Sequence, residues 1–222
     1  MLICIALPLV EAERASFLEL TVSRFKFYSI IIESSDGLKI CKKACFTGPI
    51  LKLNEHTHQS DEDEALSLLK SGKVVGLMSD GGAPCIGDPG ATLVRRSHQA
   101  HIEIKTHGIH SYVLSALVAS GCNANQFSYL GYLPKITQEQ AQVLKRLHAL
   151  SGTWAFIETP YRFQKTFETC LNHLPPKAWL AVSIDLGLTT ERTGAKSVAD
   201  WKKSDWKTFL AQKPLGVVSF EL

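Results

Sequence analysis

The sequence has no apolar run of the roughly 18 residues that a membrane-spanning helix needs. Its six cysteines include no Cys-x-x-Cys pair, and a chain of 222 residues needs no disulfide framework, so reduced, cytosolic thiols are expected. The basic excess is small as well, because a net charge of +3 is weak for a dedicated nucleic-acid binder. These absences favour a cytoplasmic globular protein with a buried core over a membrane, disulfide-rich or strongly basic one.

Apolar, strand-like segments alternate with helical segments along most of the chain. Strands are predicted at residues 2–10, 27–32, 50–53, 74–79, 102–105, 127–133, 153–157, 179–184 and 214–220. Helices are predicted at 60–71, 89–99, 112–120, 138–150 and 161–171. Such alternation indicates an α/β fold built from βαβ units with a mainly parallel sheet. A seam at residues 106–111 divides the chain into predicted domains 1–108 and 109–222.

The most informative segment is the loop Ser79–Gly90, which follows an apolar run with the pattern of a buried strand. It holds four glycines and two prolines in twelve residues, so neither a strand nor a helix can continue through it. Asp88 and Pro89 at its end predict a helix start, with Asp88 as the N-cap. Loops at the carboxyl ends of parallel strands are where open α/β sheets bind ligands, and glycine lets the backbone approach them closely.

The loop resembles the Ser-Asp-Ala-Gly-Thr-Pro-x-Ile-Ser-Asp-Pro-Gly signature of the tetrapyrrole methylase superfamily. Eight of the eleven specified positions match, and Gly81, Ala83 and Gly87 depart. Three further blocks are similar to that superfamily in the same order, at residues 54–57, 127–134 and 157–162. The likeness is greatest to the branch of ribosomal RNA ribose 2′-O-methyltransferases that act on a small-subunit cytidine. It is weak at residues 1–50 and after 185, and an arginine usual after the second strand is missing at Glu33–Asp36.

This resemblance implies a two-lobed α/β fold with a mainly parallel N-terminal sheet and a mixed C-terminal sheet. It also implies S-adenosylmethionine as the methyl donor, ribosomal RNA or the small ribosomal subunit as the partner, and a homodimer. By position in the motifs, the cofactor-binding residues are expected to be Pro8, Gly81, Gly82, Ala83, Ile86, His110 and Ser111.

A ribose hydroxyl is a poor nucleophile, so its methylation gains from a general base. Asp80 and Glu158 are the first candidates for catalysis, ahead of Asp88, Glu33 and His110. Glu33, Lys135 and Arg162 are expected to bind the substrate. Two alternatives stay open: Asp80 holds loop amides only, and Glu158 pairs structurally with Arg162.

Other residue patterns have plainer interpretations. The histidines of His56-x-His58 and His107-x-x-His110 lack clustered cysteine or carboxylate partners, so no metal site is predicted. Phe127, Tyr129 and Tyr132 are interpreted as core or cleft wall rather than as base-stacking residues. Two other functions stay open: methyl transfer to a tetrapyrrole or another small molecule, and a non-catalytic scaffold that binds S-adenosylmethionine or RNA.

Overall fold

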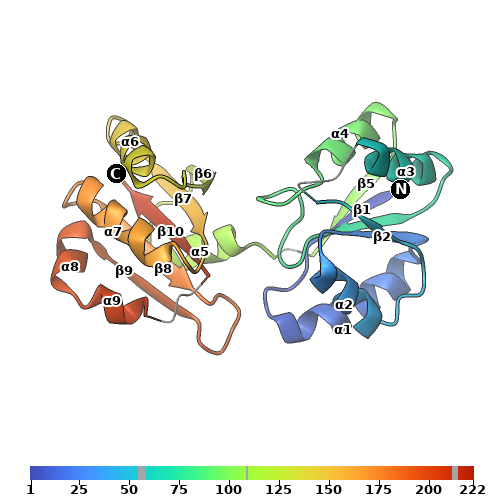
Figure 1. The fold of residues 1–222 in the computed structure, drawn as a ribbon, viewed down its shortest axis with the longest axis horizontal. Helices are drawn as coiled ribbons and strands as arrows, with labels where there is room; N and C mark the ends of the chain where they lie inside the picture. The colour runs from blue at the N-terminus through green and yellow to red at the C-terminus, as the bar shows by residue number, and fades with distance from the viewer. Residues whose placement is uncertain (55–58, 109, 212–214) are drawn as a thin grey trace. The chain divides into compact units, whose positions relative to one another are not determined.

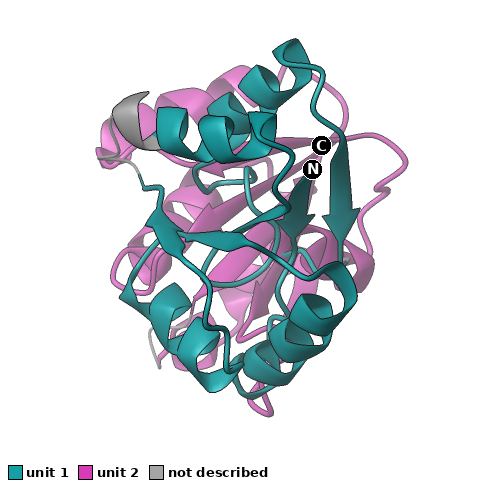
Figure 2. Cartoon of the chain, turned by 90° about the vertical axis from the view of Figure 1, so that its right-hand side faces the viewer, with its two compact units in different colours: residues 1–111 teal, residues 112–222 magenta. Residues whose placement is uncertain are grey.

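The computed structural model describes residues 1–54, 59–108, 110–211 and 215–222. The chain divides into two compact units, residues 1–111 (unit 1) and 112–222 (unit 2), which Figure 2 colours separately. Each unit contains one five-stranded sheet with helices packed on it, so both are α/β (Figure 1). Among the described residues, no helix combines the length and the apolar character needed to cross a bilayer.

Unit 1 is built on a fully parallel sheet, as the alternating pattern predicts. Its elements are β1 (Leu2–Ile5), α1 (Glu11–Phe25), β2 (Ser29–Ile32), α2 (Ser35–Lys43), β3 (Ile50–Lys52), α3 (Gln59–Lys70), β4 (Val75–Met78), α4 (Ala91–Gln99) and β5 (Ile104–His107). The strand order is β3-β2-β4-β1-β5. The carboxyl ends of all five strands therefore lie at one edge of the sheet.

The helices of unit 1 cover both faces of this sheet. Leu18 of α1 and Ile40 of α2 pack with Ile3, Ile5 and neighbouring residues on one face. Leu69 of α3 and Leu93 of α4 pack with residues of the other face. The loops after β1 and β4, two adjacent strands, therefore lead to helices on opposite faces (Figure 1).

Unit 1 departs from the sequence prediction in three places. Helices α1 and α2 were not predicted; α1 fully buries only Leu18 and Thr21, so its apolar pattern is weak. The prediction that Asp88 caps the next helix was wrong, because α4 begins at Ala91 with Gly90 at the N-cap. β5 lies two residues further on than predicted, because pairing with β1 sets Ile104 opposite Leu2.

Unit 2 is built on a mixed sheet, as the resemblance implies. Its elements are α5 (Tyr112–Ser120), β6 (Phe127–Tyr132), α6 (Thr137–Leu147), β7 (Thr153–Glu158), α7 (Phe163–His173), β8 (Trp179–Ile184), β9 (Arg192–Ser197), α8 (Val198–Lys203), α9 (Trp206–Phe209) and β10 (Gly216–Glu221). The strand order is β6-β7-β10-β8-β9, with β6 and β7 parallel and the other pairs antiparallel. β9 was not predicted, because it is a polar edge strand that contains Arg192, Thr193, Lys196 and Ser197.

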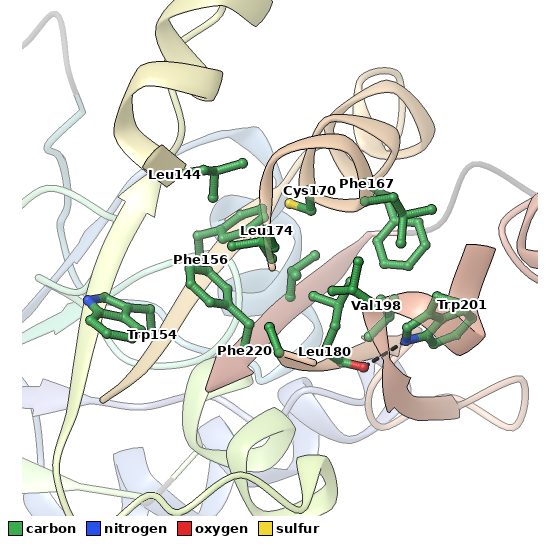
Figure 3. Packing of buried hydrophobic residues seen from close by; sticks show 14 of the residues in the cluster. Leu144, Trp154, Phe156, Phe167, Cys170, Leu174, Leu180, Val198, Trp201 and Phe220 are labelled. Atoms are coloured by element: carbon green, nitrogen blue, oxygen red, sulfur yellow. Dashed lines mark hydrogen bonds between the residues drawn. The ribbon is translucent and has the colours of Figure 1, made fainter. Parts of the chain in front are cut away.

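The main core of unit 2 is aromatic. Trp154 stacks on Phe220, and Phe167 packs edge-on against Trp201 (Figure 3). The indole N–H of Trp201 donates to the carbonyl of Leu180 at 2.7 Å, so this large side chain is buried without an unpaired donor. Helices α6, α7 and α8 contribute to this core, whereas α5 packs against the strands through a separate set of contacts. The core thereby fixes the loops that leave β6 and β7.

Candidate functional site

The loops after β1 and β4 are joined to each other at the carboxyl edge of the unit 1 sheet. The Leu7 amide donates to the Gly82 carbonyl at 2.9 Å, and the Gly82 amide donates back to the Leu7 carbonyl at 3.0 Å. Adjacent strands whose loops diverge to opposite faces form the usual ligand crevice of an open α/β sheet. The structure therefore brings together three of the predicted cofactor residues, Pro8, Gly81 and Gly82, at the position where this fold binds ligands.

Gly82 is buried and has a φ of 81°, a conformation that side-chain-bearing residues rarely adopt. Glycine at this position allows the loop to turn back on Leu7 and to form the two backbone hydrogen bonds with it. Ala83 is half-buried and Ile86 is exposed, so the loop presents small or outward-facing side chains after the turn. Its surface is consequently backbone-rich, as close approach to a ligand requires.

Arg14 connects the two loops and was missed by the sequence analysis. Its Nε donates to the Pro8 carbonyl at 3.0 Å and its Nη2 donates to the Leu9 carbonyl at 2.9 Å. A Cβ added at Gly81 would lie 2.8 Å from the same Nη2, so the guanidinium also lies against the β4 loop. The arginine thus fixes the first loop while it contacts the second. The sequence analysis missed this role because Arg14 lies in the first turn of a helix that was not predicted.

Asp80 anchors the start of α2. One carboxylate oxygen accepts a hydrogen bond from the Ser34 hydroxyl at 2.6 Å, and the other accepts from the Gly37 amide at 3.1 Å. A carboxylate at a helix N-terminus is stabilised by free N–H groups and by the helix dipole. Each oxygen accepts one bond from a neutral donor, which leaves lone-pair capacity on both.

Ser79 and Asp88 lie at the two ends of the same loop. The buried Ser79 hydroxyl lies 3.3 Å from the Gly81 carbonyl oxygen and within 3.4 Å of that of Gly82. Burial raises the pKa of Asp88 above its ordinary value; the hydrogen bond from Ser79 opposes this shift, and nearby Asp80 adds to it. The carboxylates of Asp80 and Asp88 therefore lie close enough for their charges to influence each other.

The other predicted residues of unit 1 lie near the same edge with different contacts. The ring of His110 packs edge-on against Phe17 of α1, and His107 stacks on the same phenyl group. Burial and the charge of Arg24 lower the pKa of His107. Ser111 and Glu33 are half-buried and both take part in polar contacts. His110 is therefore held by apolar packing at the end of unit 1.

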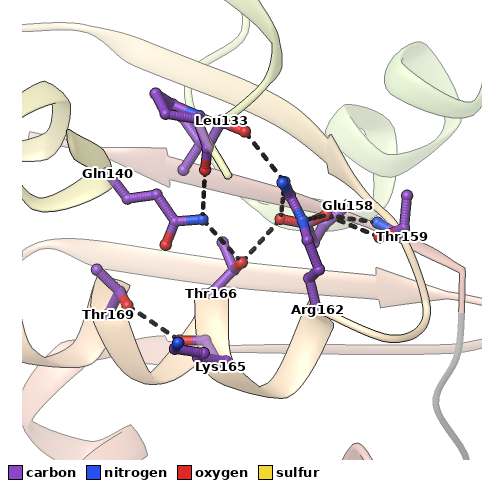
Figure 4. Close-up of polar contacts among 9 residues, drawn as sticks. Leu133, Gln140, Glu158, Thr159, Arg162, Lys165, Thr166 and Thr169 are labelled. Atoms are coloured by element: carbon purple, nitrogen blue, oxygen red, sulfur yellow. Dashed lines mark hydrogen bonds and ion pairs between the residues drawn. The ribbon is translucent and has the colours of Figure 1, made fainter. Parts of the chain in front are cut away.

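In unit 2, Glu158 is fully buried at the end of β7 and lies at the centre of a hydrogen-bond network (Figure 4). Its Oε1 accepts from the Thr159 amide at 2.7 Å, from the Thr159 hydroxyl at 3.2 Å and from Arg162 Nε at 2.9 Å. Its Oε2 accepts from Arg162 Nη2 and from the Thr166 hydroxyl, both at 2.7 Å. Five donors occupy the two oxygens, so the carboxylate has no remaining capacity for a substrate proton. The alternative that Glu158 pairs with Arg162 is what the structure contains.

The network continues into the loop that follows β6. Arg162 Nη2 also donates to the Leu133 carbonyl at 3.0 Å, and the Gln140 amide group donates to the Pro134 carbonyl at 2.8 Å (Figure 4). The Arg162 guanidinium is thus directed into the protein rather than toward an acceptor phosphate. Lys135, the other predicted phosphate ligand, is exposed on the loop that these bonds hold.

Two of the three aromatic residues that were interpreted as core or cleft wall, Phe127 and Tyr132, do not belong to the core. Tyr132 has 51% of its surface exposed and Phe127 has 40%, whereas Tyr129 is half-buried. Tyr161, which the sequence analysis did not single out, is 88% exposed. The signal that could have found Tyr161 is its position between Pro160 and Arg162 in a loop after a strand.

Metal ligands do not cluster in the part of the chain that the structure describes, where no group of three or more histidine, cysteine, aspartate or glutamate side chains is placed to hold an ion. His56 and His58 lie outside the described residues, as does most of the 54–57 block that resembles the superfamily.

Comparisons with known proteins agree with this architecture. No protein-family model matches the chain. The chain is 29% identical over 159 residues to the ribosomal RNA small subunit methyltransferase I of Buchnera aphidicola, a match that covers 70% of this chain and 56% of that protein. The chain therefore spans about half the length of the curated relatives it matches.

Among solved structures, the fold is similar to that of the methyltransferase CobJ, with a TM-score of 0.61 and 16% identity over 99% of this chain and 93% of that one. The fold is also similar to that of the cobalamin biosynthetic enzyme CbiF, a cobalt precorrin-4 methyltransferase. This match has a TM-score of 0.57 and 13% sequence identity, and it covers 99% of this chain and 94% of that one. The chain thus has the two-unit α/β fold of these methyltransferases. Together with the sequence match, this likeness of fold agrees with the resemblance of the Ser79–Gly90 loop to the tetrapyrrole methylase superfamily.

Proposed function

We propose that the chain is an S-adenosylmethionine-dependent methyltransferase that holds its cofactor at the joined loops of unit 1. The observation that carries this proposal is the reciprocal Leu7–Gly82 bridge, which sets bare backbone at the carboxyl edge of the sheet. Two features fit the cofactor: the turned backbone of Gly82 and the nearby carboxylates of Asp80 and Asp88, which favour a cationic sulfonium. The names of the relatives support the same reaction class.

When bound, the cofactor supplies an electrophilic methyl group that is transferred in line to the acceptor without a metal. The residues of this chain then have to hold the cofactor, orient the acceptor and remove the proton from its hydroxyl. Arg14 keeps the Pro8–Leu9 turn against the β4 loop, which limits movement of the groups that would surround the methyl donor. Holding two reactants at attack distance supplies much of the acceleration in such a displacement.

Asp80 is the better of the two predicted catalytic carboxylates. Its oxygens retain acceptor capacity and it lies beside Gly81, so it is able to accept the proton that a hydroxyl loses on methylation. Glu158, whose oxygens are occupied by five donors, is assigned a positioning role instead. Arg162 takes the same role, because its guanidinium holds Glu158 and the Leu133 carbonyl.

The preferred acceptor is a ribose 2′-hydroxyl of small-subunit ribosomal RNA. Two observations support it: the matched relatives are named as small-subunit ribosomal RNA methyltransferases, and the basic excess is concentrated in unit 2. Unit 2 has 12 lysines and arginines against 8 acidic residues, whereas unit 1 has 12 against 13. An excess of positive charge in one half favours a polyanionic partner there. The homodimer implied by the resemblance stays a prediction that light scattering would check.

Calorimetric titration of S-adenosylmethionine into the wild type, Arg14→Met and Arg24→Met tests the proposed function. Arg24 is the matched control, because it is exposed in the last turn of the same helix, over the ring of Phe25. The wild type and Arg24→Met are expected to bind alike, and Arg14→Met about tenfold or more weakly, since two hydrogen bonds that hold the Pro8–Leu9 turn are lost. A folded wild type that does not bind the cofactor would contradict the proposal and favour a scaffold.

A further inference from the structure

We propose that the loops after β6 and β7 form a surface that stacks on the bases of single-stranded RNA. The surface, called here the aromatic loop face, consists of Tyr132, Lys135, Ile136 and Tyr161. The inference rests on the proposed function only in its choice of an RNA partner, because the surface itself follows from exposure, geometry and charge in unit 2.

The aromatic loop face contains three large side chains that are mostly exposed. Tyr161 is 88% exposed, Ile136 57% and Tyr132 51%. An aromatic side chain buries a large area when a partner covers it. Two tyrosines that lie largely in solvent are therefore a candidate contact surface. A tyrosine ring offers a face on which any base is able to stack.

Residues next to the two tyrosines are joined by one hydrogen bond. Tyr132 pairs with Ile157 across the β6–β7 strand pair, and Leu133 follows it. Arg162, which follows Tyr161, donates to the Leu133 carbonyl at 3.0 Å. Both tyrosines therefore lie one residue away from the same fixed contact, close enough to serve one strand of RNA.

The buried network explains how such exposed loops hold a defined geometry. Glu158 and Arg162 form a bidentate ion pair with additional hydrogen bonds from Thr159 and Thr166. A buried ion pair adds little net stability compared with an apolar core, but it penalises alternative arrangements that would separate the charges. The network therefore orders the loops in advance and lowers the conformational cost of binding.

The charge of unit 2 fits a nucleic-acid backbone, because the unit carries 12 lysines and arginines against 8 acidic residues. Lys135 is exposed, and Arg192 lies at the same end of the sheet because it pairs with Ile184 across β8 and β9. Two carboxylates lie at the same end, the half-buried Asp185 and the exposed Glu191, and they accept hydrogen bonds from the Thr190 hydroxyl and the Gly187 amide. Stacking on exposed rings requires unpaired bases, so the partner is a single strand or loop rather than a duplex.

The test is fluorescence anisotropy of a labelled single-stranded oligoadenylate with the full chain, using wild type, Tyr161→Ala, Tyr161→Phe and Tyr28→Ala. Tyr28 is the matched control: it is a tyrosine 41% exposed in unit 1, with the Lys73 ammonium 4.6 Å from its ring centre. Tyr161→Ala is expected to weaken binding roughly five- to hundredfold, the range for loss of one base–aromatic stack. Tyr161→Phe and Tyr28→Ala should bind as the wild type does, and duplex RNA should compete poorly.

The outcomes separate this inference from the proposed function, because cofactor affinity is measured on the same variants. Wild-type RNA affinity in Tyr161→Ala, or no RNA affinity in the wild type, overturns the aromatic loop face even if S-adenosylmethionine binds. Weakened RNA binding by Tyr161→Ala supports it even if the cofactor does not bind. An equal loss in Tyr161→Phe would also overturn it, because the ring would then not be the contact.

Discussion

Unit 1 and unit 2 each place a carboxylate at or just after the carboxyl end of a strand, but they surround it differently. Asp80, two residues after β4, accepts one bond at each oxygen from the neutral donors Ser34 and Gly37. Glu158, the last residue of β7, accepts five, two of them from the Arg162 guanidinium. The first arrangement leaves acceptor capacity at a backbone-rich loop, and the second uses all of it to fix two loops.

This difference agrees with the division of charge and aromatic residues between the units. All four tryptophans, Trp154, Trp179, Trp201 and Trp206, lie in unit 2, together with the basic excess. Unit 1 combines a parallel sheet with a net charge of −1, and unit 2 combines an aromatic core with +4. The contrast supports the proposal that cofactor chemistry resides in unit 1 and polyanion recognition in unit 2.

Breaking the ion pair of unit 2 is expected to give the largest effect. Arg162→Met leaves the fully buried Glu158 without its cation, and loss of one partner of a buried pair costs about 3–5 kcal/mol. Urea unfolding followed by tryptophan fluorescence measures this loss in unit 2, where all the tryptophans lie. The double variant Glu158→Gln, Arg162→Met should lose less than Arg162→Met alone. Equal losses would show that the pair is not the cause.

The matching change in unit 1 is expected to cost less. Asp80→Ala removes the acceptor of the Ser34 hydroxyl and the Gly37 amide at the start of α2, which is worth about 1–2 kcal/mol by analogy with helix caps. Asp80→Asn keeps an oxygen for the Gly37 amide, so it should lose less than half as much. Thermal unfolding followed by circular dichroism measures both variants.

Turnover sharpens the same comparison between the two carboxylates. If Asp80 is the proton acceptor, both Asp80 variants should lose roughly 100-fold or more in methyl transfer although their stabilities differ. If turnover instead falls in proportion to the loss of stability, little in Asp80→Asn and more in Asp80→Ala, Asp80 has only its anchoring role.

The sequence was sufficient to predict features that depend on local composition. The glycine-rich loop 79–90, the apolar strands and the possible pairing of Glu158 with Arg162 four residues later are all visible in short windows. The alternation of strands and helices predicted the α/β class, and the resemblance implied the mixed sheet of unit 2; the structure confirms both.

Features that depend on which strands become neighbours were not predictable. Ser34 lies 46 residues before Asp80 and meets it only because β2 and β4 are adjacent in the sheet. The alternation of strands and helices does not determine that order. Arg14 bonds to backbone carbonyls, which any residue carries, so no side-chain pattern marks its partners.

The smallest effect concerns Asp88, a carboxyl in unit 1 that is part-buried and, among the described residues, forms no salt bridge. Burial raises its pKa in the folded protein above the unfolded value. Such a group contributes stability below its unfolded pKa, and that contribution is lost as the pH rises through the folded pKa. Asp88→Asn should therefore be more stable than the wild type at neutral pH by about 0.5 kcal/mol, a small value because solvent screens a part-exposed group.

Asp200 in unit 2 is a control for which the pKa shift, and so the expected change in stability, has the opposite sign. The hydrogen bond from Ser197 and the charge of Lys203 lower its pKa, so its contribution is present above the unfolded pKa and is lost as the pH falls through the folded pKa. Asp200→Asn should accordingly be less stable than the wild type at neutral pH, and both differences should shrink in acid. Unfolding free energies of the three proteins across the acid range measure this. A stability difference for Asp88→Asn that persists in acid would show that its effect comes from packing in the β4 loop rather than from the carboxylate charge.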